Sequence, residues 1–112
     1  MAEDEDKIVL VVDDSAMMRR IVAEVVRQAG CRVFEAADGY GALARLKECQ
    51  PDLIILDLIM PGMSGLATLR ELRAMPATAE VPIIMLTVED SAEVMQRAMA
   101  ERATGYLTKP ID

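Results

Sequence analysis

The feature that most constrains the fold of this chain is a series of short apolar runs rich in β-branched residues. The first run, residues 8–12, and the third, residues 53–56, are continuous rather than alternating. Such a run is buried on both faces, which is typical of a strand in a parallel sheet covered by helices. Five runs are predicted to be strands, at residues 8–12, 33–36, 53–56, 82–86 and 106–108.

Helical patterns occupy the stretches between these runs. Apolar residues from Met18 to Ala29 recur at the spacing of one helix face, with Ser15 as a candidate N-cap and Gly30 at the end. Further helices are predicted around Leu43 and Leu46 after an Asp38-Gly39 turn, and around Leu66, Leu69 and Leu72 with Ser64 as cap. A fourth helix is predicted to start at Asp90 or Ser91 and to include Met95, Ala98, Met99 and Arg102. Strictly alternating strands and helices predict an α/β fold with a doubly wound, five-stranded parallel sheet.

Composition excludes several functions. The chain has 112 residues and a net charge of −7, so we expect one domain over residues 7–112 after an acidic, disordered tail over residues 1–6. It contains no histidine, which excludes a phosphohistidine carrier and a histidine metal ligand. Negative charge and 3% aromatics argue against direct nucleic-acid binding. No long apolar run indicates a membrane segment, and the isolated Cys31 and Cys49 favour a reduced, cytoplasmic protein.

Polar residues follow four of the predicted strands. Asp13 and Asp14 follow the first, Asp57 the third, Thr87 the fourth and Lys109 the fifth. Because the carboxyl ends of parallel strands share one edge, where ligands bind in open α/β sheets, we expect these side chains to meet. Each has a simpler explanation on its own: a helix cap for Asp13 or Asp14, a strand-forming residue for Thr87, a solvated lysine, and a satisfied strand-end carboxylate for Asp57.

Taken together, these residues predict a metal site. Three clustered carboxylates repel one another and stay ionised only if a cation neutralises them. Oxygen ligands without histidine or cysteine select Mg²⁺, or Mn²⁺ as an alternative. One carboxylate can then attack phosphorus and form an aspartyl phosphate, while Lys109 and Thr87 bind phosphoryl oxygens.

The motifs resemble those of a known family, the receiver domain of bacterial two-component response regulators, and most of all its single-domain chemotaxis type. The resemblance extends from residue 7 to residue 110 and rests on the stretches VVDDS at 11–15, MRRI at 18–21, Asp57 with MPGMSG at 60–65, PIIMLT at 82–87 and GYLTKP at 105–110. It implies the flavodoxin-like strand order 2-1-3-4-5.

The resemblance also implies a role for each site residue. Asp57 would be the phosphoacceptor, and the metal ligands would be Asp14, Asp57, Asp13 acting mostly through water, and the backbone carbonyl of Ile59. Lys109 and Thr87 would bind the phosphoryl group, Thr87 and Tyr106 would form the switch, and the bond before Pro110 would be cis. The donor would be a histidine kinase or a histidine phosphotransfer protein, and the target a downstream protein or an appended output domain. Such a receiver assists its own phosphorylation and dephosphorylation but is not otherwise an enzyme.

Four departures from the family pattern affect these expectations. Val88 stands where a small residue is usual and would narrow access to Asp57. The apolar side chain of Ile59 offers no hydrogen bond to an attacking water, and Arg102 stands where glycine is frequent. The family's fifth helix is missing, which predicts an under-covered apolar sheet face and therefore a homodimer, an exchanged oligomer or a marginally stable chain. The alternative function is a degenerate receiver that binds a protein without being phosphorylated. A metal-dependent phosphatase is less suited to the chain, which has no segment to spare for a substrate cap.

Overall fold

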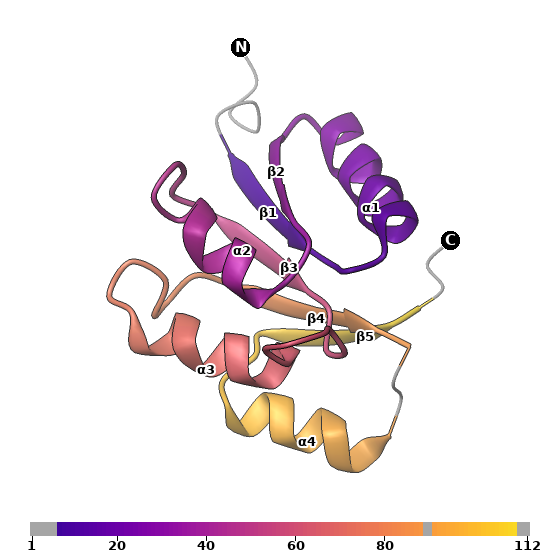
Figure 1. Ribbon diagram of the computed structural model, residues 1–112, viewed down its shortest axis with the longest axis vertical. Coiled ribbons are helices and arrows are strands. Elements are labelled where there is room, and N and C mark those ends of the chain that lie inside the picture. The colour runs from indigo at the N-terminus through magenta and orange to yellow at the C-terminus, as the bar shows by residue number, and fades with distance from the viewer. Residues whose placement is uncertain (1–6, 89–90, 110–112) are drawn as a thin grey trace.

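The computed structural model describes residues 7–88 and 91–109, which form one five-stranded parallel sheet in the order β2-β1-β3-β4-β5 (Figure 1). The strands are β1 (Ile8–Val12), β2 (Arg32–Ala36), β3 (Leu53–Leu56), β4 (Ile83–Thr87) and β5 (Gly105–Thr108). The helices are α1 (Ala16–Gln28), α2 (Gly39–Arg45), α3 (Gly65–Ala74) and α4 (Ala92–Ala100). The predicted fold class, strand order and four helices are confirmed. The predicted acidic tail and the Pro110 bond lie outside the described residues.

The sheet separates two apolar clusters because successive strand side chains point to opposite faces. On one face, β1 and β3 contribute Leu10 and Ile54 to the larger cluster, which packs beneath α2, α3 and α4. On the other, Val9 and Val11 pack with Val22 of α1. Figure 1 shows α1 on its own side of the sheet. Burial on both faces explains why the strand sequences are continuous apolar runs.

Side-chain caps fix where the helices begin, and so where the site loops end. Ser15 accepts a hydrogen bond from the backbone N–H of Met18 at 3.2 Å, and Ser64 accepts one from Ala67 at 3.1 Å. Both caps were predicted. For α4 the cap is Ser91, while Asp90, the other predicted start, lies outside the described residues. None of the helices in the described ranges is long and apolar enough to cross a bilayer.

One face of α1 differs from the sequence pattern. Ile21, Val22 and Val25 all belong to its predicted apolar stripe, but only Val22 of the three is buried, together with Ala23, while Ile21 and Val25 are 43% and 57% exposed. The reason is that α1 packs against β1 and β2, and within residues 7–88 and 91–109 no other helix lies beside it on that face. Leu107 of β5 points to the same side and is 54% exposed.

Candidate functional site

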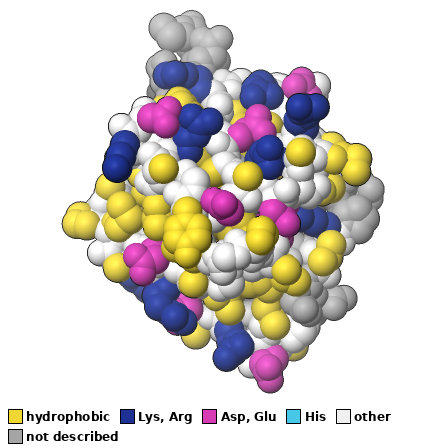
Figure 2. Space-filling model, in the orientation of Figure 1, with side chains coloured by type: hydrophobic (Ala, Val, Ile, Leu, Met, Phe, Trp, Pro, Cys, Tyr) yellow, Lys and Arg dark blue, Asp and Glu magenta, His cyan; other side chains and the backbone are white. Residues whose placement is uncertain are grey.

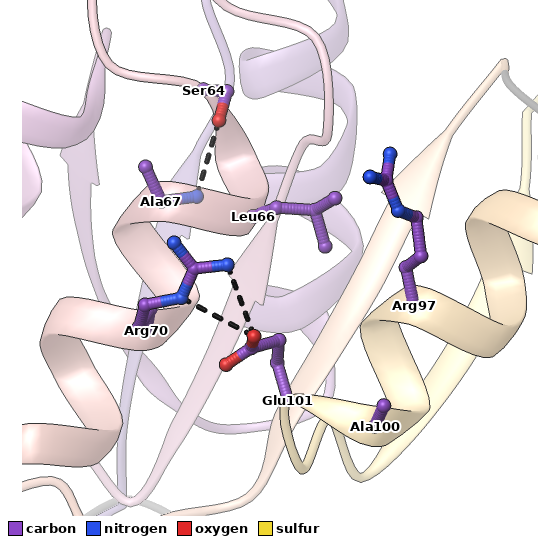
Figure 3. A pocket seen from close by; sticks show the side chains of 7 residues that line it. All are labelled: Ser64, Leu66, Ala67, Arg70, Arg97, Ala100 and Glu101. Carbon is purple, nitrogen blue, oxygen red and sulfur yellow. Dashed lines mark hydrogen bonds and ion pairs between the residues drawn. The ribbon is translucent and has the colours of Figure 1, made fainter.

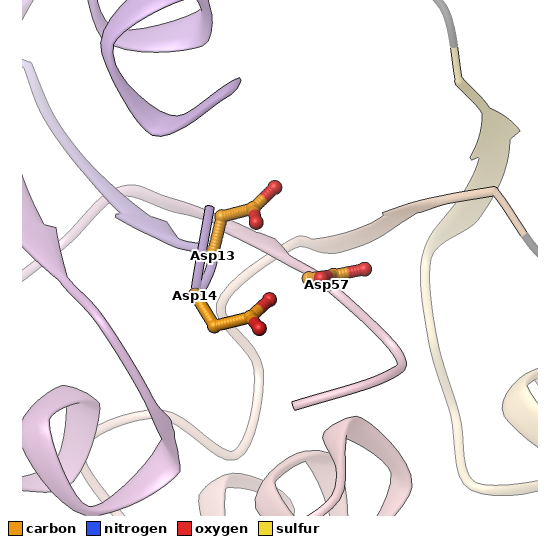
Figure 4. A group of neighbouring side chains, drawn as sticks. All are labelled: Asp13, Asp14 and Asp57. Carbon is orange, nitrogen blue, oxygen red and sulfur yellow. The ribbon is translucent and has the colours of Figure 1, made fainter. Parts of the chain in front are cut away.

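Three carboxylates meet at the carboxyl edge of the sheet. Asp13 and Asp14 directly follow β1, and Asp57 directly follows the neighbouring β3. Each residue offers one carboxylate oxygen, and these oxygens lie within 4.8 Å of one another (Figure 4). Asp13 and Asp57 are buried, whereas Asp14 is exposed. The predicted convergence of the three side chains is present in the structure.

Backbone pairing continues one residue beyond the strands and fixes the two buried aspartates. The N–H of Asp13 donates to the Ala36 carbonyl at 3.1 Å, and the N–H of Asp57 donates to the Val12 carbonyl at 2.9 Å. Their carboxylates are therefore carried by the rigid end of the sheet rather than by a free loop. Sites placed on such elements hold their geometry more accurately than sites on loops.

Lys109 supplies the cation in this cluster. Its backbone N–H donates to the Thr87 carbonyl at 2.7 Å, which ties the residue after β5 to the end of β4. Its Nζ lies 2.6 Å from Asp13 Oδ2 and 3.6 Å from Asp57 Oδ2, with the lysine side chain only 9% exposed. One ammonium faces three carboxylates, so with all three ionised the described cluster keeps an excess of two negative charges.

The electrostatics of Asp57 reflect this imbalance. Burial raises the pKa of Asp57 above its ordinary value, and the neighbouring Asp13 charge raises it further. The Lys109 ammonium, a hydrogen bond with the Thr87 side chain and one with the Leu58 backbone act in the opposite direction without outweighing burial. Additional positive charge at this edge would favour the ionised carboxylate.

Two neighbours of Asp13 were not anticipated from the sequence. The backbone N–H of Ser15 donates to Asp13 Oδ1 at 2.9 Å, and Arg19 Nη1 donates to the Asp13 carbonyl at 2.8 Å. Arg19 is itself held by Glu35 of β2, with Nε 3.1 Å from Oε1. These contacts orient the buried aspartate. The Ser15 contact is local in the sequence, whereas the Arg19 contact depends on a side-chain conformation and on the neighbouring strand β2, which no local sequence signal encodes.

The other predicted residues occupy different environments. Thr87 is fully buried at the end of β4. Tyr106 of β5 is half-buried and packs against the larger apolar cluster. Ile59 and Val88, in the loops around the site, are 57% and 67% exposed. Asp13, Asp14, Asp57, Thr87 and Lys109 are thus brought together, while the Tyr106 ring lies against the core.

Open parallel sheets bind their ligands outside the carboxyl ends of the strands, which is where this acidic cluster lies. Residues 9–112 match the family model of the response regulator receiver domain, and the chain belongs to this family. The resemblance noted from the motifs is therefore confirmed. Proteins of this family act in phosphorylation-dependent signalling and bind Mg²⁺ at an acidic pocket.

Individual relatives agree with this assignment. The phosphate regulon transcriptional regulatory protein PhoB of Escherichia coli is 38% identical over 91% of this chain, which spans only 44% of that relative's length. The solved structure of Vibrio cholerae chemotaxis protein CheY4 has a TM-score of 0.90 and 40% identity, covering 95% of this chain and 88% of that chain. The Mn²⁺-bound form of response regulator Rcp1 has a TM-score of 0.86 and 28% identity, covering 96% and 84%.

Proposed function

We propose that this chain is a phosphorylation-dependent signalling switch that accepts a phosphoryl group on Asp57 in a Mg²⁺-dependent reaction. The observation that carries the proposal is the position of the Lys109 ammonium, 2.6 Å from one buried carboxylate and 3.6 Å from another. A cation in this place can move from a carboxylate to a phosphoryl oxygen without leaving the site.

The metal would be held by oxygen ligands alone. Asp14 and Asp57 would bind Mg²⁺ directly, Asp13 mostly through water, and Ile59 through its backbone carbonyl. The donor set fits a hard divalent cation, because the described cluster lacks two positive charges and offers no softer ligand. Mn²⁺ accepts the same ligands, and the relative Rcp1 was solved in a Mn²⁺-bound form. When bound, the metal neutralises charge on the carboxylates and the phosphoryl oxygens.

Asp57, Lys109 and Thr87 would each have a separate role in the phosphoryl transfer. A carboxylate oxygen of Asp57 forms a bond to phosphorus as the bond between phosphorus and the donor's histidine nitrogen breaks, and the nitrogen keeps the electron pair. Lys109 and the Thr87 hydroxyl hold two of the equatorial oxygens. Water later cleaves the acyl phosphate in the same site, so the receiver assists its own dephosphorylation.

Phosphorylation would change the surface near Thr87 and Tyr106, and a partner would recognise this change. Thr87 is fully buried beside Asp57, and on the neighbouring strand β5 Tyr106 lies two positions before Thr108, the register partner of Thr87. Movement of Thr87 toward a phosphoryl group would let Tyr106 turn further inward and change the surface there. The donor is a histidine kinase or a histidine phosphotransfer protein, the target is a downstream protein or an output domain, and the location is the cytoplasm.

Intact mass after incubation with acetyl phosphate and Mg²⁺ tests the proposal. We expect the chain to gain one phosphoryl group, and to gain none in a metal chelator or in the Asp57→Asn variant. Glu71→Gln is a matched control, since it also removes one carboxylate but lies exposed on α3. A chain that gains no phosphoryl group and does not respond to Mg²⁺ would be the degenerate binding module instead.

A further inference from the structure

A second concave site lies between α3 and α4, away from the acidic edge. It has a volume of about 440 Å³, within the range of small ligand sites. Figure 3 shows its lining, which combines an apolar floor of Leu66, Ala67 and Ala100 with polar side chains around it. We call this site the α3–α4 groove; its full lining is Ser64, Leu66, Ala67, Arg70, Arg97, Ala100 and Glu101.

The charges around the groove are not balanced. Arg70 contacts Glu101 through both Nε and Nη2, at 3.2 and 3.0 Å from the same oxygen. Arg97 rises from α4 beside Leu66, and within residues 7–88 and 91–109 no carboxylate oxygen lies within 4.0 Å of its guanidinium. Even Glu93, one helical turn earlier, forms no ion pair with it. Two arginines and one glutamate therefore leave one uncompensated positive charge beside an apolar floor.

We propose that the α3–α4 groove binds an acidic peptide segment of a partner protein, with an apolar side chain on the groove floor and a carboxylate on Arg97. A guanidinium is well suited to a carboxylate, with which it forms charge-assisted hydrogen bonds. The groove is open along two helices rather than enclosed, which suits a peptide laid between them better than a small molecule. Because the whole chain has a net charge of −7, the attraction to an acidic partner comes from the α3–α4 groove and its Arg97 guanidinium, not from the net charge of the chain.

The groove is joined to the acidic site by the start of α3. Ser64 lines the groove, and the N–H of the next residue, Gly65, donates to the Leu58 carbonyl at 2.7 Å. A Cβ atom at Gly65 would collide with the backbone oxygen of Asp57, so helix and phosphoacceptor loop are in direct contact. Resting on the proposed function, we infer that peptide binding and Asp57 phosphorylation influence each other, with equal coupling in both directions.

Fluorescence anisotropy with two labelled peptides tests the site. One peptide contains glutamate, leucine and alanine, and the other has lysine in place of glutamate. We expect the acidic peptide to bind and the basic one not to, with Arg97→Ala weakening binding about fivefold or more and Arg97→Lys weakening it less. Arg20→Ala, at an exposed position on α1, is the matched control and should leave binding unchanged. Equal binding of both peptides, or unchanged affinity in Arg97→Ala, would overturn the proposal.

A second arm separates this proposal from the phosphoryl chemistry. The Asp57→Asn variant should bind the acidic peptide as the unmodified chain does, so failure of phosphorylation would leave the peptide site standing. Acetyl phosphate and Mg²⁺ should change the affinity of the unmodified chain at least twofold and leave that of Asp57→Asn unchanged. Phosphorylation of Asp57 without any change in peptide affinity would contradict the coupling.

Discussion

At the scale of single residues, the site depends on how one lysine is shared between two buried carboxylates. Lys109, Asp13 and Asp57 each have side chains less than a tenth exposed. An ion pair removed from water is expensive to break on one side, because the remaining charge is left buried without a partner. In this cluster the buried carboxylates carry the negative charge that a metal ion would bind, and Lys109 carries the positive charge that a phosphoryl group would bind.

Replacing the lysine should expose this dependence. In a metal chelator, Lys109→Met should lower the free energy of unfolding by about 3–5 kcal/mol, since it leaves two buried carboxylates without a cation. Adding Mg²⁺ should recover part of the loss, because an ion that binds only the folded state stabilises it. Denaturant unfolding measures both effects. Lys47→Met, at an exposed position, should show neither; a loss in Lys109→Met that Mg²⁺ leaves unchanged would speak against the metal site.

Replacing Asp57 should raise the free energy of unfolding, whereas replacing Lys109 should lower it. Its pKa is raised above the ordinary value, mainly by burial, so its ionised form costs the folded state free energy. In a chelator at neutral pH, Asp57→Asn should therefore be more stable than the unmodified chain. As pH falls through the pKa of Asp57 in the folded state, the unmodified chain becomes protonated there and the difference should shrink. Thermal unfolding across pH measures this, with Glu71→Gln as the neutral comparison; a pH-independent difference would refute the cause given.

The sequence predicted those site residues that directly follow a strand. Asp13, Asp57, Thr87 and Lys109 were all predicted, because the end of a buried strand can be read from its apolar run. The role of Arg19 could not be predicted, since its contacts with the Asp13 carbonyl and with Glu35 need the tertiary structure. The metal-ligand and switch roles of these residues stay predictions.

At the scale of elements, the start of α3 is in direct contact with the loop that begins at Asp57. Gly65 is buried, and its lack of a side chain lets the first turn of α3 touch the backbone of Asp57 and Leu58. This is a close approach of two backbones rather than an unusual backbone angle, and only glycine permits it.

A single methyl group added at Gly65 should lower the stability of the fold and slow its phosphorylation. Gly65→Ala should cost about 1–3 kcal/mol of folding free energy, because the helix or the loop must shift to accept the Cβ. It should also slow phosphorylation by acetyl phosphate, measured by intact mass. The control is Gly105→Ala in β5, where a Cβ would meet Ile84 at an ordinary 3.8 Å. If both variants behaved alike, the close approach at α3 would not be what positions the loop.

Element boundaries could be predicted to within one residue for the strands, but helix burial could not. The predicted run 82–86 became Ile83–Thr87, because Pro82 has no N–H for the ladder and only its carbonyl pairs, with Ile54 at 3.0 Å. The prediction that the fourth helix includes Arg102 is wrong, because α4 ends at Ala100 and Arg102 has a φ of 70°. This backbone conformation favours glycine, which explains the family preference noted at this position. The exposure of Ile21 depends on what lies beside α1, which periodicity alone cannot reveal.

At the scale of the whole molecule, the two faces of the sheet are unequally covered. Three helices pack on one face and α1 alone packs on the other, among the residues that the structure describes. Exposed apolar side chains on the α1 side include Ile21, Val25 and Leu107. The space-filling view shows hydrophobic and charged side chains mixed over the visible face (Figure 2).

This inequality predicts self-association of the 112-residue chain. Exposed apolar side chains on one side of the sheet favour burial against another molecule. Light scattering coupled to size-exclusion chromatography should therefore show a dimer or an exchanged oligomer whose fraction rises with concentration, and Leu107→Glu should shift it toward monomer. A monomer at all concentrations with a high melting temperature would contradict this prediction.

The central claim, that Asp57 is the residue phosphorylated among three clustered carboxylates, is tested most directly by locating the modified atom. After reaction with acetyl phosphate and Mg²⁺, hydroxylamine converts an acyl phosphate into a stable hydroxamate, whose position tandem mass spectrometry of the digested chain can assign. The account predicts a hydroxamate at Asp57 and at no other residue. A hydroxamate at Asp13 or Asp14, or none at all in a chain that has gained a phosphoryl group, would contradict it.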